Sequence, residues 1–245
     1  MQSFDGWVIE RLRAHGAYAG ILDNAPGRAM IDGLKKFQQA EGLDVTGMAD
    51  EATVHALRRQ GNSRESGFKV LGRSVPVPRE PIFMREARRY LGIKEVAGAK
   101  ANPTIIGFAK ALGGWVASYY TSDETPWCGL GLGYCIAATL PNEVLPSNPL
   151  SALAWKNFGM PLTNRAVGAI LVFVREGGGH VGFYVGEDDI CYHVLGFNQS
   201  NSVTITRVEK SRCVAIRWPK TSEPPIGGPV FMTATAGVPI SRNEA

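Results

Sequence analysis

The sequence has no uninterrupted apolar run of the roughly 18 residues that a membrane-spanning helix needs. Its four cysteines show no Cys-x-x-Cys spacing, which disfavours a zinc site built on paired cysteines. The N-terminal segment MQSFDGWVIERLRAHG contains neither the apolar stretch nor the small-residue cleavage site of a secretory signal. We therefore expect a chain that is made in the cytoplasm without a signal peptide.

Neither sign of charge dominates, since 26 Lys and Arg residues accompany 22 Asp and Glu residues. The basic surplus lies in residues 66–245, which suits an anionic polymer such as cell wall or nucleic acid. The sequence lacks a Lys/Arg stripe with interleaved aromatic residues, and this disfavours nucleic acid. The length of 245 residues and the hydrophobic content of 44% are those of a globular chain with room for two domains.

The N-terminal region has the periodicity of short helices. Met30, Leu34 and Phe37 recur at helical spacing, and Asp50 is placed to cap a further short helix. Together with an earlier amphipathic segment, this pattern predicts a bundle of three short helices over residues 1–62.

The segment GLKKFQQAEGLDVTGMADEATVHAL resembles the three-helix peptidoglycan-binding domain of wall hydrolases, over roughly residues 5–60. The residues that match its FQ…GL…G…T pattern are Phe37-Gln38, Gly42-Leu43, Gly47 and Thr53. The family usually has Asp-Gly pairs where this chain has Asp23-Asn24 and Thr46-Gly47. The resemblance implies a wall-binding module, whereas the residues alone allow a helical bundle without a ligand.

The rest of the chain divides by composition. Residues 63–81 are rich in Gly, Ser and Pro, which predicts a linker, and residues 220–245 predict a Pro/Gly-rich tail that is a surface strap or disordered. Between them, in residues 82–219, helical patterns precede strand patterns, which indicates an α+β domain with an antiparallel sheet. The expected helices are 82–91, 103–112, 126–140 and 149–158, and the expected strands are 167–174, 180–186, 190–196, 202–208 and 213–218.

One cysteine is placed for chemistry. Thr125 is predicted as a helix N-cap and Pro126 as the first helical residue, so Cys128 falls in the first turn, where the helix dipole favours thiolate. The following GLGLG puts three glycines in this helix at a cost of roughly 1 kcal/mol each, which predicts close packing against a sheet. The other cysteines, interpreted as core residues, are Cys135, Cys191 and Cys213.

Two histidines in the strand region compete for the role of base. A three-residue turn at residues 187–189 would set His180 opposite Gly196, with Asn198 on the same side and His193 on the core side. A two-residue turn would instead bring His193 to the face of His180 and move Asn198 away from it. We favour the three-residue turn and leave the other register open.

Cys128, His180 and Asn198 follow the chain order of papain-like enzymes. The blocks TPWCGLGLGYC, GGGHVGFYVG and LGFNQSNSV resemble the CHAP-like cysteine amidases and peptidases of phage lysins and bacterial wall hydrolases, over residues 82–218. This resemblance implies a papain-like α+β fold in which Cys128 is the nucleophile, His180 the general base and Asn198 the residue that orients it. Relatives often read Gly-Gly-Asn-Gln where this chain has Gly-Phe-Asn-Gln, so Gln199 is the substitute for the third role.

Further polar residues are candidate auxiliaries. Glu95, Asp123 and Glu124 carry carboxylates suited to the amine of a stem peptide, but they equally fit a solvated turn and helix-start charges. Tyr120, or its neighbour Tyr119, is a candidate for an oxyanion hole with the backbone N–H of the nucleophile, or for a place in the core.

These observations predict a peptidoglycan hydrolase that resembles a modular phage endolysin. It would cut a stem-peptide amide, as an N-acetylmuramoyl-L-alanine amidase or an endopeptidase, and so lyse the bacterial wall. We expect a monomer with peptidoglycan as partner, no nucleic acid, no metal and no cofactor, which reaches the wall through a holin pore or a secretion machine. The alternatives are a glycosidase using Glu95 with Asp123 or Glu124, and a non-catalytic wall-binding protein.

Overall fold

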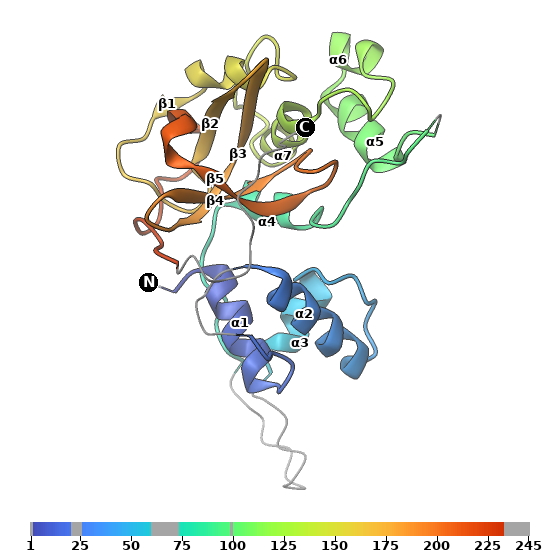
Figure 1. The fold of residues 1–245 in the computed structure, drawn as a ribbon, viewed down its shortest axis with the longest axis vertical. Helices are drawn as coiled ribbons and strands as arrows, with labels where there is room; N and C mark the ends of the chain where they lie inside the picture. Colours follow the sequence, from blue (N-terminus) through green and yellow to red (C-terminus); the bar gives the residue numbers. More distant parts are fainter. Residues whose placement is uncertain (1, 21–25, 60–73, 99, 233–245) are drawn as a thin grey trace, which may run out of the picture. The chain divides into compact units, whose positions relative to one another are not determined.

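The computed structural model divides the chain into two compact units, drawn in Figure 1. The first unit extends to Arg79, and the second runs from Glu80 to Phe231. A helical N-terminal region is followed by a domain built on an antiparallel sheet, so the predicted α+β class is confirmed. The described residues are 2–20, 26–59, 74–98 and 100–232. No helix within these ranges has both the length and the apolar character needed to cross a bilayer.

The first unit is a bundle of three helices, as predicted. The helices are α1 (Phe4–Ala14), α2 (Arg28–Glu41) and α3 (Glu51–Leu57). Asp50 caps α3 through Oδ1, which accepts a hydrogen bond from the Thr53 backbone N–H at 2.8 Å. The buried core side chains include Trp7, Val8, Ile9, Leu12, Met30, Leu34, Phe37 and Leu57.

A buried glutamine organises the loop between α2 and α3. Gln38 Nε2 lies 2.8 Å from both Thr46 Oγ1 and the Met48 carbonyl oxygen, and 2.9 Å from Thr53 Oγ1. Its Oε1 accepts from the Gly47 N–H at 2.8 Å, and Gly47 has a left-handed φ of +72° that favours glycine. Gln38, Gly47 and Thr53, which match the FQ…GL…G…T pattern, therefore stabilise the fold of this unit.

Part of the predicted linker belongs to the first unit. Val75 and Val77 pack against the helical core, and the Val75 N–H donates to the Arg58 carbonyl oxygen at 3.0 Å. The apolar surface that these valines bury explains why a Pro-rich segment stays on the bundle here. Residues 60–73 and the Asp23-Asn24 pair lie outside the described residues.

Helix α7 (Cys128–Thr139) lies at the centre of the second unit. It contacts α4 (Ile82–Arg88), α5 (Pro103–Leu112) and strand β3 (Gly178–Glu187), so it lies between two other helices and the sheet (Figure 1). Helix α6 is additional to the prediction, and the expected helix at 149–158 is a shorter 3₁₀ turn, η1. The elements are α4 (Ile82–Arg88), α5 (Pro103–Leu112), α6 (Gly114–Tyr119), α7 (Cys128–Thr139) and η1 (Ala152–Asn157).

The sheet has six antiparallel strands in the order β1-β6-β2-β3-β4-β5. The five strands expected from the sequence are found within a few residues of their predicted positions, and the two-residue edge strand β1 is additional. The strands are β1 (Met160–Pro161), β2 (Ile170–Arg175), β3 (Gly178–Glu187), β4 (Cys191–Gly196), β5 (Thr204–Glu209) and β6 (Cys213–Trp218), with the 3₁₀ turn η2 (Lys210–Arg212) before β6.

The β3–β4 register differs from the favoured prediction. Gly182 lies opposite Gly196 and Tyr184 opposite Val194, whereas the prediction set Gly182 opposite Val194. A bulge between Tyr184 and Gly186 shifts the pairing near the turn. The predicted pairing was therefore wrong by two residues.

A shift of two residues changes partners but leaves each side chain on its predicted face. His180 and Gly196 share a face, since a Cβ added to Gly196 would lie 2.8 Å from His180 Nε2. His193 alternates with Val194 along β4 and so points to the other face. The predicted separation of the two histidines is therefore confirmed, although the turn used to derive it was not.

The described part of the predicted tail packs on the second unit. The Glu187 N–H donates to the Val230 carbonyl oxygen at 2.8 Å, and the Val230 N–H donates to the Tyr184 hydroxyl oxygen at 3.0 Å. The Trp218 indole donates to the Glu223 carbonyl oxygen at 3.0 Å. The two contacts of Val230 hold the segment against the end of β3. Residues 233–245 lie outside the described residues.

Candidate functional site

Cys128 is the first residue of α7, and Trp127 occupies the N-cap position. The helix therefore begins two residues later than predicted, and neither Thr125 nor Pro126 has the expected role. Trp127 is buried, and its indole N–H donates to Glu95 Oε1 at 2.8 Å, which anchors the chain just before the helix. Cys128 remains in the first turn, as the sequence predicted.

Cys128 is only 4% exposed. Burial raises its pKa above the ordinary value of a cysteine, while backbone N–H groups of Val181 and Gly129 act in the opposite direction and only partly offset this. The expected resting thiolate is therefore wrong, because desolvation outweighs the helix start. The contact with Val181 nevertheless places the sulfur against β3, beside the residue that follows His180.

His180 is fully buried near the start of β3. Its ring stacks on Phe173 with centroids 6.3 Å apart and planes inclined by 25°. Its Nε2 lies 3.2 Å from Gln199 Oε1. The ring is therefore fixed both by a neighbouring strand and by the segment that follows β4.

The orientation of the Gln199 amide determines the tautomer of His180. Gln199 Nε2 donates to backbone carbonyl oxygens, the closest being that of Thr204 at 2.7 Å. Oε1 is then the atom that faces His180, and it also accepts from Thr206 Oγ1 at 2.9 Å. Because Oε1 can only accept, His180 must carry its proton on Nε2, and the lone pair of the neutral ring lies on Nδ1.

Gln199, rather than Asn198, contacts the imidazole. Asn198 has a left-handed φ of +59°, and its buried Oδ1 has no hydrogen-bond partner among the described residues. A tight turn closes here, since the Gln199 N–H donates to the Ser202 carbonyl oxygen at 2.8 Å. The sequence argument extended strand alternation past Gly196, and the left-handed backbone breaks that alternation.

The glycines of α7 are explained by close packing. A Cβ at Gly131 would overlap the ring of Phe197, and a Cβ at Gly129 would overlap the Pro149 carbonyl oxygen. Of these two neighbours, only Phe197 is next to the sheet, since it directly follows strand β4. The predicted packing against a sheet is therefore found at Gly131 but not at Gly129. Gly133 has only ordinary contacts, the nearest at 3.5 Å from Trp155.

The candidate carboxylates differ in their surroundings. Asp123 is buried, and its Oδ2 accepts from the N–H groups of Asn102 at 2.7 Å and Val96 at 3.0 Å. Its Oδ1 has no hydrogen-bond partner within the described ranges. Glu95 receives the indole of Trp127, as described above. Glu124 is exposed, whereas Glu95 is half-buried.

Tyr120 is buried, while Tyr119 is exposed. The Tyr120 hydroxyl donates to the Thr125 carbonyl oxygen at 2.8 Å, which closes the loop that leads to α7. Burial, together with the charges of Asp123, Glu95 and Cys128, raises the pKa of Tyr120 well above its usual range. Because the hydroxyl proton is already engaged with Thr125, Tyr120 has a positioning role in this state rather than that of an oxyanion donor.

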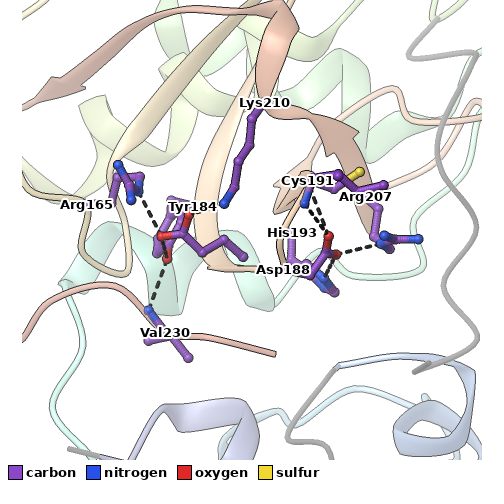
Figure 2. Close-up of polar contacts among 10 residues, drawn as sticks. Arg165, Tyr184, Asp188, Cys191, His193, Arg207, Lys210 and Val230 are labelled. Atoms are coloured by element: carbon purple, nitrogen blue, oxygen red, sulfur yellow. Dashed lines mark hydrogen bonds and ion pairs between the residues drawn. The ribbon is translucent and has the colours of Figure 1, made fainter. Parts of the chain in front are cut away.

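His193 belongs to a separate buried network, shown in Figure 2. Its Nε2 lies 2.9 Å from Asp188 Oδ2, which also accepts from Arg207 Nε at 2.7 Å, while the Cys191 N–H donates to Asp188 Oδ1 at 3.0 Å. Burial alone would raise the pKa of Asp188, but the hydrogen bonds from Arg207 and His193 outweigh it and hold the pKa far below the usual range. This network is a structural clamp at the β3–β4 turn.

The other cysteines agree with their prediction in part. Cys135 and Cys191 are buried, as core residues are, and Cys213 is half-buried. The described ranges hold no group of three or more His, Cys, Asp or Glu side chains arranged for a metal ion.

Comparison with known proteins identifies one region of the chain. Residues 6–57 match the family described as "Putative peptidoglycan binding domain". This match covers α2, α3 and all but the first two residues of α1, and it supports a cell-wall-associated role with peptidoglycan as partner. No curated protein shows significant similarity to the chain.

Proposed function

We propose that the chain is a peptidoglycan hydrolase whose second unit cuts a stem-peptide amide with Cys128 as nucleophile and His180 as general base. The observation that carries this proposal is the hydrogen bond between Gln199 Oε1 and His180 Nε2, at 3.2 Å. It presents the basic Nδ1 of a buried imidazole on the strand that also contacts the Cys128 thiol. Gln199 takes the positioning role that the family resemblance gave to Asn198.

The reaction would proceed through a thioester. Cys128 Sγ attacks the amide carbon while the thiol proton passes to His180 Nδ1, and the N–H groups at the start of α7 face the oxygen that gains charge. Collapse breaks the C–N bond, and His180 returns the proton to the leaving amine. Water then attacks the thioester with His180 as base, which releases a carboxylate and restores the thiol.

The raised pKa of Cys128 is compatible with this chemistry. A thiol that is neutral at rest needs a base at the moment of attack, and the fixed tautomer of His180 supplies one. Proton transfer and bond formation are then coupled. In an enzyme with a stable thiolate–imidazolium pair, by contrast, the proton has already been transferred before the substrate arrives.

The first unit would hold the enzyme on its substrate. The family match at residues 6–57 supports binding to peptidoglycan, and tethering raises the local concentration of the catalytic unit. On this proposal the chain is a monomeric, endolysin-like lytic enzyme that acts on the wall after release from the cell that makes it, either as a phage lysin or as a delivered toxin.

The carboxylate glycosidase is less well supported. Asp123 Oδ2 is occupied by two backbone N–H groups, and Glu95 Oε1 by the Trp127 indole. Both carboxylates therefore stabilise the loops that precede Cys128 by accepting hydrogen bonds from them. Asp123 Oδ1 is also buried, so the role in binding the amine of a stem peptide that the sequence suggested is not supported for Asp123.

The decisive experiment digests purified sacculi with the wild type, Cys128→Ala and the control Cys135→Ala, followed by mass spectrometry of the products. The proposal expects new amine and carboxylate ends from the wild type, largely retained with Cys135→Ala and abolished with Cys128→Ala. Reducing sugar ends without new amines would identify the glycosidase instead. Binding to sacculi without any cleavage would identify a non-catalytic wall-binding protein.

A further inference from the structure

Helix α6 presents two aromatic side chains to solvent. Trp115 is 48% exposed and Tyr119 is 64% exposed. They are four residues apart and so lie on one face of the helix. Their ring centroids are 6.0 Å apart with planes inclined by 60°, an edge-to-face pair in which each ring limits the rotation of the other.

The backbone around α6 fixes this presentation. Gly113 and Gly114 both have left-handed φ values, +69° and +53°, which turn the chain sharply between α5 and α6. Val116 is buried and anchors α6, which packs on α5. The buried side chain of Val116 thus holds the helix on the domain, while the rings of Trp115 and Tyr119 remain exposed to solvent.

The pair is connected to the candidate site through the loop that follows α6. Tyr119 is followed by buried Tyr120, whose hydroxyl donates to the Thr125 carbonyl oxygen. Asp123 in the same loop accepts from the Asn102 N–H at 2.7 Å. The loop that leads from α6 to Cys128 is therefore fixed at two points, and the exposed rings lie at its beginning.

We infer that Trp115 and Tyr119 form a sugar-binding platform that holds the glycan strand of peptidoglycan beside the amide to be cut. A pyranose ring offers a face of C–H groups to an aromatic ring and keeps its hydroxyls in water, so a partly exposed Trp–Tyr pair matches it in shape and polarity. Every stem peptide hangs from such a sugar. The inference rests on the proposed function, and the family match of the first unit names the same polymer.

The test uses the full chain with a Trp115→Ala/Tyr119→Ala double variant. The matched control is Phe231→Ala, which removes a 73% exposed aromatic ring from the same unit. Initial rates on sacculi are measured beside the binding of a soluble β-1,4-linked N-acetylglucosamine tetramer in a Cys128→Ala background. The expected result is a KM on sacculi raised about tenfold with kcat nearly unchanged, and loss of one class of tetramer site. Phe231→Ala should match the wild type in both assays.

The outcomes separate this inference from the proposed function. An active wild type with a double variant that behaves like Phe231→Ala would remove the platform and leave the hydrolase. A wild type that dimerises through this face, with a monomeric double variant, would also overturn it. If the wild type cuts nothing in sacculi, the hydrolase fails, and tetramer binding alone decides the platform.

Discussion

The amide oxygen of Gln199 lies 3.2 Å from Nε2 of His180, while the nitrogen of the same amide donates to the Thr204 carbonyl oxygen at 2.7 Å. An amide held at both ends in this way admits only the tautomer of His180 that is protonated on Nε2. The basic nitrogen of the ring is therefore selected by a turn after β4 rather than by the strand that carries the histidine.

We predict that Gln199→Ala lowers kcat on sacculi by roughly 10- to 1,000-fold, because the base remains but loses its fixed tautomer and orientation. The control is Asn198→Gly, which keeps the left-handed backbone of Asn198 and removes its side chain. It should retain activity per folded molecule. Initial rates beside thermal unfolding check both, and a dead but folded Asn198→Gly with an active Gln199→Ala would return the role to Asn198.

The pKa of Cys128 predicts how it reacts with an alkylating agent. Because burial raises this pKa, the rate of iodoacetamide modification should climb with pH and reach its midpoint above that of free glutathione in the same solution. Mass spectrometry of peptides separates Cys128 from the other cysteines. A midpoint below that of glutathione would indicate a preformed thiolate–imidazolium pair instead.

Two glycines of α7 give a matched pair for stability. Gly131→Ala should destabilise the second unit by about 1–3 kcal/mol, because its Cβ overlaps the Phe197 ring. Gly133→Ala should stabilise it by about 0.5–1 kcal/mol, because its nearest contact is 3.5 Å away and alanine favours the helix. Denaturant unfolding of both variants measures the difference, and equal effects would contradict the packing of Phe197 on α7.

The clamp of Figure 2 predicts an acid-labile second unit. The folded pKa of Asp188 lies far below its unfolded value, so its contribution is fully present above the ordinary carboxyl range. It begins to decline as the pH falls below about 4 and is lost only as the pH falls through the lower folded pKa. Asp188→Asn should cost roughly 3 kcal/mol near pH 7. The gap to the wild type should narrow below about pH 4 and still be present near pH 3, because the folded carboxyl group remains ionised there. Asp189→Asn, at the exposed neighbour, should follow the wild type throughout. A pH-independent gap between Asp188→Asn and the wild type would show that charge is not the cause.

The order of elements was predictable because periodicity is a local property. The spacing of Met30, Leu34 and Phe37 gave α2, and the alternation of Val181 and Phe183 gave the faces of β3. The start of α7 was predicted two residues early, because the preferences of Thr125 and Pro126 were outweighed by the burial of Trp127 against Glu95. Local sequence preferences decide where a helix begins only when no tertiary contact favours a different start.

The site could be predicted only where the backbone is regular. Cys128 and His180 lie in regular elements, and the contact of the thiol with Val181 agrees with their predicted proximity. Gln199 lies in a turn with left-handed residues at Asn198 and Ser200, where alternation no longer tells which side chain points inward. The bulge after Tyr184, which shifts the register between β3 and β4, likewise cannot be recognised from the sequence.

The burial of Cys128 also bears on how long the protein stays intact. Peroxide and disulfides react with thiolate far faster than with thiol, so a nucleophile held neutral resists oxidation to sulfenic acid and beyond. All four cysteines are free, and Cys135 and Cys191 are buried with Cys128. If Cys128 is the nucleophile that we propose, its thiol then stays available for reaction in surroundings without reductases.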